Sequence, residues 1–170
     1  MLKVLGALCV MAGALWCALG AVRELARRAD VLAELTAALA YLEEELAFRM
    51  PPLPRLLESL SRERPGAAGQ FFGAVAAGLR DEPEAGLYQS WRQAMTRQLP
   101  MLQPEERRLM LEVGQTLGRY DAKTQRQALG RSRERLGVFR DEARGEVRRL
   151  GKVYAAVSLA GGAVIVLVLA

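Results

Sequence analysis

Two long uncharged runs, one at each end of the chain, limit the folds that are open to this sequence. The first extends from Val4 to Val22 and the second from Val153 to Ala170, and every charged side chain except that of Lys3 lies between them. Roughly 20 apolar residues cross the core of a bilayer as a helix, which satisfies its own backbone hydrogen bonds where lipid cannot. We therefore predict transmembrane helices over residues 1–22 and 153–170 and a helical domain over residues 23–152.

The first run also has features of a cleaved signal peptide, and this alternative stays open. Residues Met1–Lys3 resemble a basic n-region, and "ALGA" at 18–21 resembles a cleavage site. Two features argue against it: the apolar run is longer than an ordinary signal core, and arginines follow it immediately.

The charges that flank the two runs predict the orientation of the domain. Basic residues collect on its side of each run, at Arg23, Arg27, Arg28, Arg140, Arg144, Arg148, Arg149 and Lys152. Because positively charged flanks stay in the cytosol, we predict two spans with the central domain cytosolic.

Apolar residues between the runs recur with helical spacing throughout. The first stripe consists of Leu25, Leu32, Leu35, Leu39, Leu42 and Leu46. Prolines and glycines in "MPPLPRLL", "RPGAAG", "DEPEAG" and "LQPEER" indicate where further helices begin. We predict an all-α fold, a compact bundle of five to six helices flanked by the two transmembrane helices. Its first and last helices should lie side by side and continue into the uncharged runs.

The stretch "LEVGQTLGRYDAKTQ", residues 111–125, has two interpretations. Its paired glycines could suggest a phosphate-binding loop, but no strand precedes them and no Lys-Ser/Thr follows. A helix–turn–helix corner explains the residue types better. Gly114 would allow a close approach of another backbone, Gly118 would close a helix in the left-handed conformation, and Asp121 would cap the next helix.

The composition argues against an enzyme. The chain has no histidine, which is the commonest general base and metal ligand. Its two cysteines, Cys9 and Cys17, lie inside the first apolar run, and no pair of acidic residues stands out as acid and base. We expect no catalytic residues, cofactor, metal site or small-molecule substrate.

The corner also carries a family resemblance. Gly114, Leu117, Gly118, Asp121 and Gln125 form the pattern Gly-x-x-Leu-Gly-x-x-Asp-x-x-x-Gln, and "MPPLPRLL", "SWRQAM" and the apolar tail support it. Over essentially its whole length the chain resembles the stage III sporulation protein AB family. Tyr120 departs from the small polar residue expected there.

The resemblance implies a membrane protein of the apparatus that the mother cell builds towards the forespore. The domain would be similar to the inner-membrane platform proteins of type II secretion and type IV pilus systems, which engage a cytosolic secretion-type ATPase. The implied location is the mother-cell membrane around the forespore. The implied partners are that ATPase, other membrane proteins of the stage III sporulation complex and the lipid bilayer.

Two groups of charged residues are candidates for docking a partner: Glu43, Glu44 and Glu45, and the arginines Arg131, Arg133 and Arg135. The alternative is that both groups are simply solvated helix faces. The alternative function is a membrane-tethered nucleic-acid-binding module that uses the arginine-rich last helix. Interspersed acids such as Glu134, Asp141 and Glu142 argue against this alternative.

Overall fold

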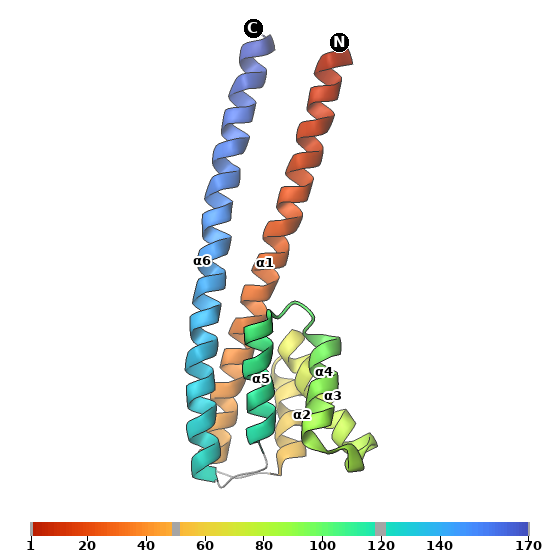
Figure 1. The fold of residues 1–170 in the computed structure, drawn as a ribbon, viewed down its shortest axis with the longest axis vertical. Coiled ribbons are helices and arrows are strands. Elements are labelled where there is room, and N and C mark those ends of the chain that lie inside the picture. The colour runs from red at the N-terminus through yellow and green to blue at the C-terminus, as the bar shows by residue number, and fades with distance from the viewer. Residues whose placement is uncertain (1, 49–51, 118–121, 170) are drawn as a thin grey trace. The chain divides into compact units, whose positions relative to one another are not determined.

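The computed structural model describes the backbone of residues 2–48, 52–117 and 122–169. Side chains are described for residues 20–48, 52–117 and 123–153, and for Gly13 and Trp16. The regular structure in these ranges is entirely helical, which confirms the all-α prediction for the part described. The helices are α1 (Leu2–Phe48), α2 (Leu53–Glu63), α3 (Ala67–Asp81), the 3₁₀ helix η1 (Pro83–Ala85), α4 (Gly86–Gln98), α5 (Pro104–Thr116) and α6 (Ala122–Leu169) (Figure 1).

The chain forms two compact units. One consists of residues 30–140, and the other consists of residues 1–29 together with residues 141–170. The helices α1 and α6 each contribute residues to both units, and each is a single unbroken helix. The prediction that the last helix continues past Tyr154 without a break is therefore confirmed.

The unit of residues 30–140 is built around the predicted leucine stripe of α1. Leu32, Leu35, Leu39 and Leu42 are fully buried. The helices α2 to α5 pack in chain order, with α3 against both α2 and α4, and α4 against α5. A side chain at Gly73 would come within 2.5 Å of Ser61 Oγ on α2, so glycine permits this close packing.

Prolines begin helices at two of the predicted places. Pro54 stands in the first turn of α2, and Pro104 is the first residue of α5. A proline is tolerated there because the first amide groups of a helix have no partner within it. At Pro83 the structure differs from the prediction, because this proline begins the 3₁₀ turn η1 and not an α-helix. The helix α4 starts only at Gly86, which has a φ of 73°.

The first and last helices are adjacent, as predicted. In the unit of residues 30–140, Glu43 of α1 pairs with Arg133 of α6 at 3.3 Å. In the other unit, the buried Arg28 of α1 donates a hydrogen bond to Glu146 of α6, also at 3.3 Å.

In the described part of the chain, no helix has a stretch that is long and apolar enough to cross a membrane. Most side chains of residues 1–22 and 153–170 lie outside the described set. The two predicted transmembrane helices stay predictions.

Candidate functional site

The predicted corner is described only in part. Gly114 lies inside α5, Leu117 follows the end of that helix, and Gln125 lies in the first turn of α6. Leu117 and Gln125 are both buried. Gly118 and Asp121 lie outside the described residues, so the predicted left-handed residue and helix cap stay predictions.

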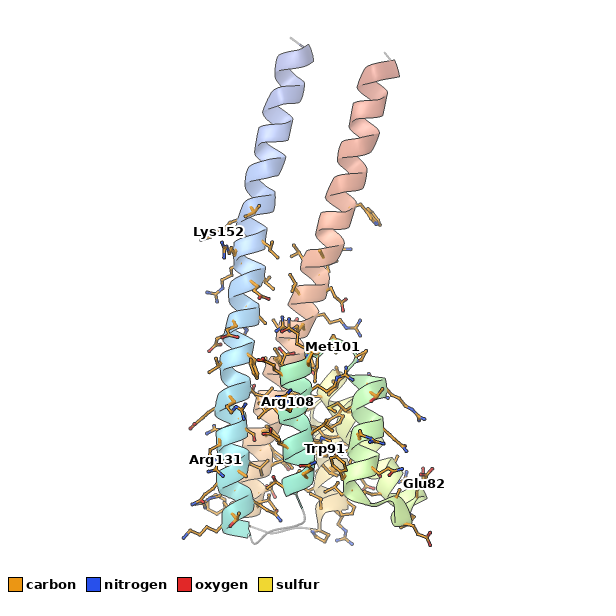
Figure 2. All side chains as sticks on the ribbon, in the orientation of Figure 1. Glu82, Trp91, Met101, Arg108, Arg131 and Lys152 are labelled. Atoms are coloured by element: carbon orange, nitrogen blue, oxygen red, sulfur yellow. The ribbon has the colours of Figure 1, made fainter. Side chains whose placement is uncertain are left out.

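Gly114 makes room for the side chain of Trp91, which points from α4 towards α5 (Figure 2). A Cβ atom at position 114 would lie 2.6 Å from Cγ of the indole. The Nε1 group of Trp91 donates a hydrogen bond of 2.8 Å to the carbonyl of Met110. A close approach at Gly114 exists, but the nearest atoms belong to an aromatic ring, whereas the prediction was another backbone.

This contact joins two of the motifs on which the resemblance rests, "SWRQAM" and the glycine of the corner. Trp91 is fully buried, and its ring lies edge-on to those of Phe71 and Phe72, with ring centres 4.9 and 5.8 Å apart. Such aromatic pairs contribute about 0.5–1.5 kcal/mol each beyond the area that they bury.

Gly114 sits within a helix, so the phosphate-binding loop is ruled out at this position.

The two charged groups predicted to dock a partner partly neutralise each other. Glu43 Oε2 lies 3.3 Å from Nε of Arg133, as an ion pair and not as an aligned hydrogen bond. Arg135 lies 3.5 Å from Glu112 of α5. Some of the charges predicted to dock a partner are therefore engaged in ion pairs between helices of this chain. Arginines engaged in this way are less available to phosphates, which weakens the nucleic-acid alternative.

The other three docking candidates are placed differently. Glu44 and Arg131 are exposed and Glu45 is half-buried. Among the described residues, none of the three makes an ion pair or a side-chain hydrogen bond. Figure 2 shows Arg131 on the exposed side of α6. Their charges are available to a partner.

A groove lies between α1 and α6 beside these residues. It has a volume of about 380 Å³ and is lined by Glu43, Arg126, Gln127, Gly130, Arg131 and Glu134. At Gly130, a Cβ atom would lie 3.2 Å from the Glu43 carboxylate. The groove brings the acidic segment of α1 and the basic segment of α6 to one place on the surface. The linear sequence did not predict this, since helical periodicity identifies faces but not which faces meet.

Glu34 has a structural role that the sequence did not indicate. Its carboxylate accepts a hydrogen bond of 3.0 Å from the amide of Ala68, in the first turn of α3. A carboxylate at this end of a helix satisfies a free amide and faces the positive end of the dipole. Glu106 caps α5 in a more local way by accepting from the amide of Gln103 at 2.8 Å.

Within the described ranges, no group of histidine, cysteine or carboxylate side chains could hold a metal ion. The described surface carries both paired and unpaired charges along the groove.

Comparisons with known proteins give one family. The chain matches stage III sporulation protein AB over residues 3–170. A solved structure titled stage III sporulation protein AB has a similar fold, with a TM-score of 0.64 and 21% sequence identity over 72% of this chain and 97% of that one. Among curated proteins, no match was found. The chain therefore belongs to the stage III sporulation protein AB family.

Proposed function

We propose that this chain is a membrane-anchored assembly component of the sporulation apparatus between mother cell and forespore. Its central domain acts as a platform that docks a cytosolic secretion-type ATPase. Membership of the family supports the part of this proposal that makes the chain a component of a sporulation complex. The platform role rests on the resemblance to secretion and pilus platform proteins. Under this proposal, other membrane proteins of the stage III complex are further partners, and the chain has no catalytic activity of its own.

The observation that carries the proposal is the continuity of α1 and α6. Each helix contributes residues to the packed unit of residues 30–140 and extends without a break into one of the uncharged runs. A flexible Gly/Ser linker would decouple a domain from its anchor, whereas a helix can transmit a displacement. Force applied to the domain by an ATPase would therefore reach the segments proposed to lie in the membrane.

The flanks of the uncharged runs support the proposed anchoring. Arg23 and Arg27 follow the first run and are exposed, and Arg148, Arg149 and Lys152 precede the second and are exposed as well. Basic residues next to a span interact with anionic lipid headgroups on the cytosolic face. The proposed location is the mother-cell membrane, with two spans and the domain in the cytosol.

A direct binding measurement tests the proposal. The full chain is reconstituted in lipid nanodiscs, and its affinity for the purified secretion-type ATPase of the same organism is measured at low and moderate salt. We expect saturable binding that weakens as salt rises, because charged surfaces steer the association. Empty nanodiscs control for binding of the ATPase to lipid. Binding no stronger than to empty nanodiscs at either salt concentration would contradict the platform role.

A further inference from the structure

We propose that the groove between α1 and α6 binds an acidic segment of a partner protein. The groove is the one lined by Glu43, Arg126, Gln127, Gly130, Arg131 and Glu134. The identity of the partner as the ATPase rests on the proposed function, whereas the chemistry of the groove does not.

The geometry of α6 gives the groove one continuous wall. Arg126, Gly130 and Glu134 follow one another at four-residue spacing, which places them on one face of the helix. Gln127 and Arg131 form a parallel row beside them. Gly130 adds no side chain in the middle of this wall, which allows the carboxylate of Glu43 on α1 to lie against α6.

The charges of the groove favour an acidic occupant. The carboxylate of Glu43 is already paired with Arg133, which lies outside the lining. Two exposed guanidinium groups, those of Arg126 and Arg131, then face one remaining carboxylate, that of Glu134. Neither arginine has an ion pair among the described residues. A guanidinium group donates two parallel hydrogen bonds to a carboxylate, so each arginine can bind one acidic side chain.

The same lining favours a protein over a nucleic acid. The carboxylate of Glu134, unpaired among the described residues, would repel the unbroken negative charge of a phosphate backbone. A peptide segment can place its acidic residues against Arg126 and Arg131 and neutral residues against the glutamates. The groove also lies in the first turns of α6, at the opposite end of that helix from the apolar run of residues 153–170.

Three variants of the full chain in nanodiscs test the proposal. Arg126→Glu with Arg131→Glu reverses the charges of the groove. Gln127→Trp fills the groove without a change of charge, at an exposed position. Arg92→Glu with Arg97→Glu makes the same change of net charge on the exposed face of α4 and serves as the control. Circular dichroism confirms that each variant is folded.

The probes are the ATPase, a labelled peptide of alternating glutamate and alanine, and a DNA duplex of random sequence. We expect both groove variants to weaken binding of the ATPase and of the peptide at least about tenfold, one factor of ten being 1.4 kcal/mol. The control should stay within about twofold, since it leaves the groove intact.

Each alternative result has a distinct meaning. If the ATPase binds the wild type and both groove variants equally, the groove proposal is wrong and the platform function stands. If only the peptide binds, and the groove variants abolish this, the groove proposal stands and the ATPase is not its partner. If neither probe binds, or if DNA binds more tightly than the peptide through Arg126 and Arg131, the groove proposal is overturned.

Discussion

The indole ring of Trp91 occupies the space that a side chain at position 114 would need. Its Nε1 group is hydrogen-bonded to Met110, one turn before Gly114 on the same helix. One side chain thus fixes both the distance between α4 and α5 and the position of one helix along the other.

Gly114→Ala should destabilise the protein by about 1–3 kcal/mol, the usual cost of overpacking a core. The new methyl group would lie 2.6 Å from the indole, which is itself fully buried and cannot move aside. Gly137→Ala is the matched control, because position 137 is also helical and has open space around its missing Cβ. The control should be neutral or stabilise by up to about 1 kcal/mol. Denaturation of the full chain in detergent micelles, followed by circular dichroism, compares the two. Equal midpoints for both variants would show that the contact at Trp91 does not limit packing.

Glu34→Ala should destabilise the domain by about 0.5–2 kcal/mol, which is the range for loss of a helix cap. Glu34 accepts the amide hydrogen of Ala68, and the N-cap residue of α3 is Gly66, which has no side chain that could cap the helix. Glu34→Gln should cost less, because an amide oxygen still accepts the hydrogen bond. Glu44→Ala, an exposed change in the same helix, should stay within about 0.5 kcal/mol. Hydrogen exchange at the amino end of α3 should quicken only in the Glu34 variants, and unchanged exchange there would rule out the cap.

The apolar pattern predicted much of this fold, because burial follows helical periodicity. Leu32, Leu35, Leu39 and Leu42 were predicted as one stripe and are fully buried. The start of α5 at Pro104 and the unbroken course of α6 were also predicted.

The sequence alone could not predict which faces meet. Glu43 and Arg133 are ninety residues apart, and their pairing depends on how α1 and α6 are rotated about their own axes. For the same reason the sequence offered both as docking candidates and gave no indication that they pair with each other. Gly114 was expected where another backbone comes close. Its nearest neighbour is instead the ring of Trp91, which comes from another helix and has no local signal.

The corner after α5 gives a third prediction. Gly118→Val should destabilise the protein by more than about 1 kcal/mol, the cost of a β-branched residue in a left-handed conformation. Asp121→Ala should cost about 1 kcal/mol as a lost helix cap. Thermal unfolding of the full chain measures both. If both variants unfold at the same temperature as the wild type, the interpretation of this stretch as a helix–turn–helix corner is wrong.

The fourth prediction concerns topology. Replacement of Cys9 and Cys17 by alanine removes both native thiols, and a single cysteine is then introduced at Gln70 or Gln103, which are exposed. A membrane-impermeant maleimide should label neither position in intact cells and both after permeabilisation, because the domain is proposed to be cytosolic. Labelling of either position in intact cells would mean that the domain lies on the opposite side of the membrane.

Photo-crosslinking in sporulating cells tests the central claim most directly. A benzoyl-phenylalanine residue is placed at Gln127 in the groove, and at Gln70 and Gln93 on exposed faces of α3 and α4. After illumination, the chain carrying the probe at position 127 should form an adduct with the secretion-type ATPase, whereas Gln70 and Gln93 should give little or none. Absence of an ATPase adduct at position 127, with both proteins present in the cell, would contradict a platform that docks this ATPase through the groove.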